Sequence, residues 1–214
     1  AGRRVGRATV TIEAGARVFL NFVLDSAPAI LLVDSGRWYQ ESQIGYYQQA
    51  LTDLLYPYDA WQISHPFDTP NDVPTADDLA KYDIVIWSAP FDSPGYIGAG
   101  EALEAYLEQG GRLFLTGQDV AYFDGGGALL FAPYLSNYLK ALYVADDSGV
   151  DAVTGSSGGP FEGLSLAIAG GDGADNQVWP DVIANADSDF AGPLAGYTPD
   201  ALAARVLVQE HRLY

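Results

Sequence analysis

The chain of 214 residues contains 49 % apolar and 18 % charged residues, a balance that can bury a sizeable core and disfavours disorder. Its 28 Asp and Glu against 10 Lys and Arg give a formal net charge of −18. Such an acidic surface repels phosphate groups, so we expect no binding to nucleic acid and no membrane insertion. No apolar run reaches the roughly 18 residues that a transmembrane helix needs.

The sequence contains neither Cys nor Met. The lack of Cys excludes disulfides, thiolate metal ligands and a Cys nucleophile. The lack of both sulfur-containing residues favours a setting exposed to oxidants, so we expect an extracellular or cell-surface location. Because the chain begins AGRRVGR without an initiating Met, it is expected to be a piece of a longer polypeptide whose other domains are its partners.

The first predicted element is a β-hairpin at residues 8–24. Apolar and polar residues alternate on both sides of a Gly-containing turn at 13–16, the pattern of two paired strands. An isolated hairpin is only marginally stable in water. Residues 1–26 are therefore expected to be the tail of a preceding β-domain.

The second predicted unit, residues 27–147, is an α/β domain. Five short apolar runs at 29–33, 58–64, 83–87, 112–116 and 142–145 are predicted strands. Amphipathic stretches at 42–56, after Thr75, at 101–109 and after Pro133 are predicted helices. This alternation predicts a doubly wound, mainly parallel sheet, with the flavodoxin-like strand order 2-1-3-4-5 as its simplest arrangement. Residues 148–214, rich in Gly, Asp and Ser, are expected to form an irregular, β-rich extension packed on the same domain.

Polar side chains follow the predicted strands, where ligands of open parallel sheets bind. They are Asp34, Ser35, Trp38, Ser64, His65, Ser88, Asp92, Thr116, Gln118, Asp119, Asp146 and Asp147. Asp and Ser at such positions also cap helices or close turns, and this structural role is the alternative for the whole set. The residues that we single out for ligand binding are Asp34, Trp38, Gln118 and Asp119.

A hydrolytic site is one hypothesis for these residues. His65 would serve as the base, one of Ser35, Ser88 and Thr116 as the nucleophile, and an aspartate such as Asp34, Asp92 or Asp119 as the third group. The sequence has no G-x-S-x-G motif, which is the usual sign of a displayed serine. His65 precedes Pro66 and equally fits an extended loop at the end of a strand.

A Ca²⁺ site is a second hypothesis, placed at residues 170–176. Asp172, Asp175 and Asn176 supply oxygen ligands in a Gly-rich stretch, although a plain turn is the alternative. Apart from Ca²⁺ we expect no cofactor, because the sequence has no phosphate-binding loop or dinucleotide motif.

Aromatic residues form a third signal near the same loops. Trp38, Tyr39, Tyr46, Phe91, Tyr96 and Tyr122 are predicted to lie at or near the carboxyl end of the sheet. Aromatic rings beside carboxylates can stack on sugar rings or anchor a protein partner, and packing within the domain is the alternative.

The phrases ILLVDSG, YDIVIW and EALEAYLEQGGRLFLTGQD together resemble class I glutamine amidotransferase-like domains of large secreted bacterial proteins. Such domains often stand beside peptidase modules, and residues 8–24 resemble the end of carboxypeptidase regulatory-like repeats. In the glutaminases of this family a Cys occupies a tight turn after the central strand, followed downstream by His and Glu. The matching turn here is Thr116-Gly117-Gln118-Asp119, without Cys and without the His–Glu pair.

These observations favour a non-catalytic accessory domain, structural or binding, of a secreted or cell-surface multidomain protein associated with a peptidase. The resemblance implies that the turn at 116–119 descends from a nucleophile elbow and has a degenerate active site. The hydrolase that uses Ser or Thr, His65 and an Asp is one alternative. A carbohydrate- or Ca²⁺-binding module is the other.

Overall fold

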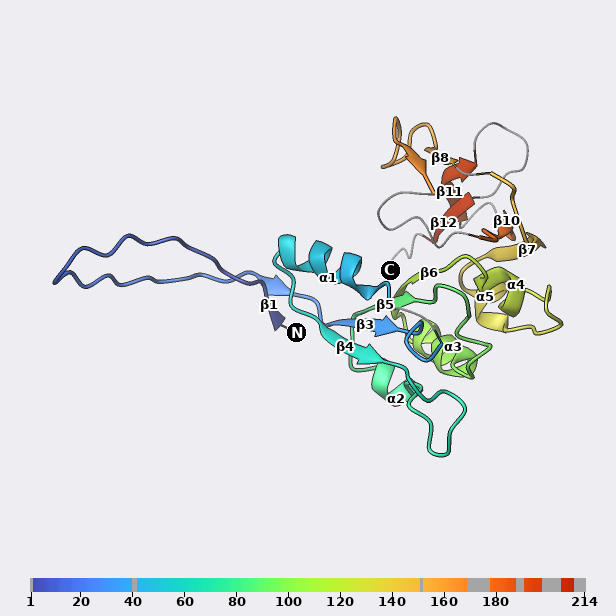
Figure 1. Ribbon diagram of the computed structural model, residues 1–214, viewed down its shortest axis with the longest axis horizontal. Helices are drawn as coiled ribbons and strands as arrows, with labels where there is room; N and C mark the ends of the chain where they lie inside the picture. The colour runs from blue at the N-terminus through green and yellow to red at the C-terminus, as the bar shows by residue number, and fades with distance from the viewer. Residues whose placement is uncertain are drawn as a thin grey trace.

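The centre of the molecule is a four-stranded parallel sheet with the order β4-β3-β5-β6 (Figure 1). The strands are β3 (Ile30–Asp34), β4 (Asp59–Gln62), β5 (Ile84–Ser88) and β6 (Arg112–Thr116), close to four of the predicted strands. The computed structural model describes residues 2–39, 42–150, 152–168 and 178–187, and the backbone of 191–197 and 205–209. Together with its helices, the sheet gives the chain a mixed α/β structure.

Helices lie against both faces of this sheet because alternate residues of β3 enter two different apolar clusters. Ile30 and Leu32 pack with Leu51 of helix α1 (Ile44–Asp53). Leu31 and Val33 belong to the larger cluster on the other face. That cluster also takes in helices α2 (Ala76–Leu79) and α3 (Gly100–Glu108). β3 is thus covered on both faces, as its continuous apolar run predicts.

The helix signals in the sequence agree with the structure. Thr75 forms a capping box with Asp78 at the start of α2. Gly110 follows α3 with a φ of 86°, a left-handed conformation that favours glycine. Pro133 begins helix α5 (Pro133–Asn137), but helix α4 (Val120–Asp124), which follows β6 directly, is absent from the sequence-based prediction. No helix within the described ranges is long and apolar enough to cross a membrane.

The fifth predicted strand forms but does not join the parallel sheet. β7 (Ala141–Ala145) pairs antiparallel with β10 (Val182–Asn185) in a separate two-stranded sheet. Leu142 and Val144 are exposed whereas Ala141 is buried, a one-sided pattern typical of antiparallel strands. The predicted order 2-1-3-4-5 is therefore correct for four strands and wrong for the fifth.

The described residues of the C-terminal region include four strands of an antiparallel sheet. They are β8 (Ala152–Gly155), β9 (Ser165–Ala167), β11 (Ala191–Tyr197) and β12 (Arg205–Gln209), in the order β12-β11-β8-β9. We call residues 148–214 the extension. Its described part is β-rich, and it returns to the central sheet through residues 178–181, whose contacts are given below.

The N-terminal residues form a long two-armed ribbon that projects from the body (Figure 1). Its turn lies where the sequence predicts, with Ala16 N donating to Glu13 O. Strand pairing among the described residues is confined to its base, where β1 (Gly2–Arg3) pairs with β2 (Ser26–Ala27). Most of the arms are exposed, and the side chain of Phe19 is 86 % exposed. The predicted turn is thus confirmed, but residues 8–24 form no strands, so the predicted pairing of two strands in this range is wrong.

Candidate functional site

The turn after β6 carries the chain from the sheet directly into α4, as in a strand–turn–helix elbow. Gly117 is required there by a close approach of the neighbouring β5–α3 loop. A Cβ at this position would lie 2.0 Å from the carbonyl oxygen of Ala89 and 2.8 Å from Cγ2 of Val120. The turn is therefore compact, and we call its residues 116–119 the elbow.

Gln118, the residue after this glycine, points into the protein. Its side chain is only 2 % exposed. Its Nε2 donates to the carbonyl of Pro90 at 3.1 Å, and its Oε1 accepts from the backbone N–H groups of Val178 at 2.6 Å and Trp179 at 3.1 Å. The side chain that we expected to bind a ligand thus connects the elbow to the extension.

Asp119 precedes α4 at the N-cap position, yet its side chain does not cap the helix. That role belongs to Asp181, whose Oδ2 accepts from the N–H groups of Ala121 at 2.7 Å and Tyr122 at 3.0 Å. Asp181 N also donates to Gln118 O. A residue of the extension therefore supplies the side-chain cap of a helix in the central domain.

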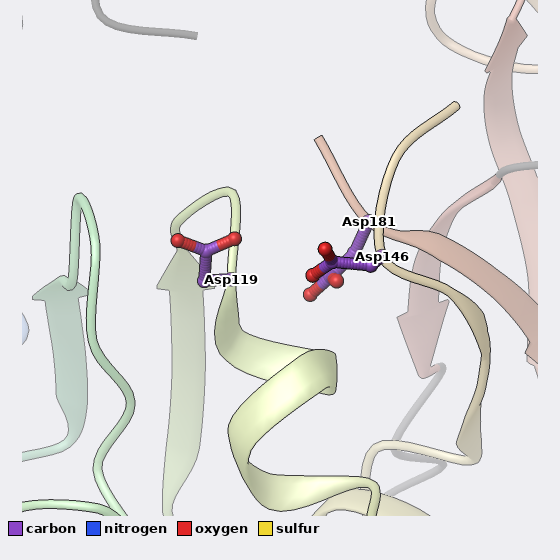
Figure 2. Close-up of side chains that lie close together, drawn as sticks. All are labelled: Asp119, Asp146 and Asp181. Atoms are coloured by element: carbon purple, nitrogen blue, oxygen red, sulfur yellow. The ribbon is translucent and has the colours of Figure 1, made fainter. Parts of the chain in front are cut away.

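The most concentrated polar feature is a group of three carboxylates, Asp119, Asp146 and Asp181, which we call the aspartate cluster. One oxygen of each lies within 4.8 Å of the others. Figure 2 shows Asp119 in the turn after β6, and Asp146 and Asp181 close together beside it. Asp146 directly follows β7 and Asp181 directly precedes β10.

Electrostatics in the aspartate cluster oppose full ionisation. Two unit charges about 4 to 5 Å apart repel by about 3 to 4 kcal/mol at an effective dielectric constant of about 20. Burial, with the charge of Asp146, raises the pKa of Asp119 to about 6. Burial, with the charges of Asp119 and Asp146, raises the pKa of Asp181 to about 8. The sequence indicates Asp119 and Asp146 as strand-end residues but gives no sign that Asp181 joins them.

A second polar group lies at the carboxyl ends of β3 and β5. Ser35 Oγ donates to Asp92 Oδ2 at 2.6 Å, and Trp38 Nε1 donates to the same oxygen at 3.2 Å. Asp92 is 1 % exposed, and burial raises its pKa to about 7. Asp34, also buried, accepts from Gly36 N within its own turn. These contacts agree with the structural alternative given for the strand ends.

A buried aspartate that sequence reasoning missed holds the β5–α3 loop against α4. Asp124 accepts from Ser93 Oγ at 2.5 Å, from Gly95 N at 3.0 Å and from the hydroxyl of Tyr134. Its exposed fraction is 0 %, and burial raises its pKa. The only signal in the sequence is an acidic residue at the end of the apolar stretch 120–123, which does not reveal its partners.

The residues of the hydrolytic hypothesis do not meet. The His65 side chain is 68 % exposed, and its Nδ1 lies 3.4 Å from Asp68 Oδ2. Within the described ranges no hydroxyl group is hydrogen-bonded to this imidazole. Ser35 donates to Asp92, the Thr116 hydroxyl accepts from Tyr47, and Ser88 is buried at 3 % exposure.

Aromatic rings gather at the same end of the sheet, as the sequence predicts. Trp38 contacts Phe67 at 5.4 Å and Tyr96 at 6.5 Å between ring centroids, and Tyr96 contacts Phe123 at 4.7 Å. We call these four residues the aromatic surface; Phe67 is 60 % and Tyr96 43 % exposed.

The other aromatic residues indicated by the sequence lie around this surface or on α1. Tyr39 packs on Trp38 and Tyr122 on Phe123, whereas Tyr46 is part of helix α1. Phe91 N donates to the Tyr39 hydroxyl.

The predicted Ca²⁺ ligands Asp172, Asp175 and Asn176 lie outside the described residues. Comparison of the chain with models of protein families, with curated proteins and with solved structures finds no significant match. The assignment of function therefore depends on the residues of this chain.

Proposed function

We propose that the chain is a non-catalytic accessory domain, structural or binding, of a secreted or cell-surface multidomain protein associated with a peptidase. The observation that carries this proposal is the separation of His65 from every candidate hydroxyl. A Ser–His–Asp device needs hydrogen-bond contact between nucleophile and base. Here the imidazole is exposed beside Asp68, and the Ser35 hydroxyl donates a hydrogen bond to Asp92.

The order of the four strands in the central sheet supports interpreting the domain as flavodoxin-like, with a doubly wound sheet of the class I glutamine amidotransferase type. The order β4-β3-β5-β6 corresponds to 2-1-3-4. In this interpretation, residues 116–119 are an elbow that has lost its nucleophile. The hydrogen bonds of the buried Gln118 amide to the backbone of Pro90, Val178 and Trp179 support a structural role for this side chain.

The proposal is tested by assaying the purified chain against a broad panel of amide and ester substrates. We expect rates equal to the buffer background for both the wild type and His65→Ala. The side chain of His65 is largely exposed, so its removal leaves the fold intact. Turnover by the wild type that His65→Ala abolishes would instead establish the hydrolase.

Carbohydrate binding is a second candidate, and the aromatic surface is the observation that favours it. Exposed rings of Phe67 and Tyr96 lie beside Trp38, which follows β3 at the carboxyl end of the sheet, where open parallel sheets commonly bind ligands. Apolar faces of sugar rings stack on such side chains, and the contact releases water from both. In this role the domain would attach its parent protein to a glycan surface.

Titration of the intrinsic Trp fluorescence with neutral and acidic oligosaccharides tests this candidate. We expect saturable binding that Phe67→Ala weakens by about tenfold or more, since a central aromatic contact contributes about 1.4 kcal/mol or more. Phe19→Ala is the matched control because this ring is also exposed but belongs to the ribbon. Equal affinity in the wild type and Phe67→Ala would exclude the aromatic surface as a sugar site.

A further inference from the structure

We propose that Asp119, Asp146 and Asp181 bind one divalent cation, Ca²⁺ in preference to Mg²⁺, between the elbow and the extension. The site differs from the oxygen-rich segment at 170–176 that the sequence suggests. Two observations carry the proposal: the mutual distances of the three carboxylates, and the unpaired, buried state of Asp119.

The distances match those between ligands of a single ion. One oxygen of each carboxylate lies within 4.8 Å of the other two. Ca²⁺ binds oxygen at about 2.3 to 2.6 Å, so two oxygens on the same ion are separated by up to about 5 Å. Only small side-chain adjustments would bring all three onto one ion.

Asp119 supplies the second, independent observation. Asp119 is only 7 % exposed, although it carries an ionisable carboxyl group. Within the described ranges its carboxylate accepts no hydrogen bond, does not cap α4, and has no Lys or Arg within 4.0 Å. Figure 2 shows one of its oxygens on the side of Asp146 and Asp181. The residue as a whole is more than nine-tenths buried, so its carboxylate has little contact with water, and a cation at this place would supply the partner that it lacks.

The chemistry of the ligands selects the kind of ion. All three are hard carboxylate oxygens, and neither His nor Cys belongs to the cluster, which disfavours Zn²⁺ and other transition metals. The three come from separate segments and are not arranged by a single loop. Ca²⁺ tolerates such irregular geometry and takes further ligands from water, whereas Mg²⁺ demands near-octahedral coordination.

The ion would join three parts of the fold. Asp119 belongs to the elbow, Asp146 to the end of β7 and Asp181 to the start of β10. Its binding energy would therefore add to the stability of the contact between the central domain and the extension.

The test is the melting temperature of the full chain in EDTA and in about 1 mM CaCl₂. We expect Ca²⁺ to raise the wild-type melting temperature by several degrees, and Asp146→Asn to abolish this rise. Asp147→Asn is the matched control, because it removes the same charge one residue away and leaves the cluster complete. It should retain the rise.

Isothermal titration calorimetry with CaCl₂ measures binding directly and does not depend on a change in stability. We expect one site in the wild type, and none in either Asp146→Asn or Asp119→Asn. A wild type without a Ca²⁺-dependent rise or a binding signal would overturn the proposal. So would a rise that survives in Asp146→Asn but disappears in Asp172→Ala, since that result would place the ion at residues 170–176.

Discussion

Asp181 caps helix α4 in place of Asp119, the residue at the N-cap position. The Asp181 carboxylate accepts from Ala121 N and Tyr122 N, while the Asp119 side chain makes no capping contact. The helix end is satisfied by a residue 60 positions further along the chain. As a consequence, Asp119 is left buried beside two other carboxylates, and the extension is tied to the elbow.

The first prediction concerns the pH dependence that this arrangement creates. Asp119 and Asp181 have folded-state pKa values of about 6 and about 8, above their usual value of 3.8. The folded state therefore binds these protons more tightly than the unfolded state. The resulting stability is fully present below pH 3.8 and is lost as the pH rises through 6 and 8. Without Ca²⁺, Asp119→Asn should exceed the wild type in unfolding free energy by about 1 to 3 kcal/mol at about pH 8.

Urea denaturation in EDTA at about pH 5 and about pH 8 measures this difference. It should shrink at the lower pH, where Asp119 is mostly protonated. Staying above pH 5 also keeps Asp78 ionised, because its contacts with Lys81 and Thr75 lower its pKa to about 2. Asp147→Asn serves as the control and should follow the wild type. A variant no more stable than the wild type at the higher pH would contradict the electrostatic account.

The second prediction tests the link made by Gln118. Gln118→Ala removes the donor to Pro90 O and the acceptor for Val178 N and Trp179 N. These groups lie where the Gln118 side chain is almost completely buried. Leaving these backbone groups unpaired should lower the unfolding free energy by about 2 to 4 kcal/mol. Gln49→Ala is the control: Gln49 Nε2 donates only to Asp53 on the exposed surface of α1, and its loss should cost less than about 0.5 kcal/mol. Comparable losses in the two variants would show that Gln118 is not a structural link.

The core of the fold could be predicted from the sequence because local signals decide it. The first four residues of β3 (Ile30–Asp34) are all apolar, which predicts a strand covered on both faces. Thr75 and Asp78 form the capping box that their spacing suggests. β7 also forms where expected, but its partner could not be predicted. Pairing with β10 depends on a segment 41 residues later, Ala141 to Val182, whose strand signal is weak.

The candidate site was only half predictable for the same reason. Asp119 lies in the turn after β6 and Asp146 directly follows β7, so the sequence indicates both as residues at the ends of predicted strands. Asp181 enters the cluster through tertiary contacts that no local pattern encodes. Gln118 was expected to face a ligand because it follows a strand, but the extension covers it. The position of a residue after a strand predicts its place at the end of the sheet, but it does not predict which distant segment will pack over its side chain.

The third prediction concerns the glycine of the elbow. In Gly117→Ala the new methyl group would lie 2.0 Å from Ala89 O, a backbone atom that cannot rotate away. We expect a loss of about 2 kcal/mol or more in unfolding free energy. Gly45→Ala is the matched control, since Gly45 is in helix α1 with nothing within 4 Å of the new Cβ. That variant should be more stable than the wild type by up to about 1 kcal/mol. A wild-type stability for Gly117→Ala would show that the elbow is not tightly packed.

The most direct measurement of whether the elbow has lost its nucleophile is the intact mass of the protein after treatment with a reactive fluorophosphonate probe. An activated Ser or Thr hydroxyl forms a stable adduct with this reagent because a neighbouring base takes its proton. Our account predicts an unchanged mass for the wild type, at a probe concentration that fully labels a serine hydrolase in the same tube. A stoichiometric adduct on Ser35, Ser88 or Thr116 that is absent in His65→Ala would contradict it.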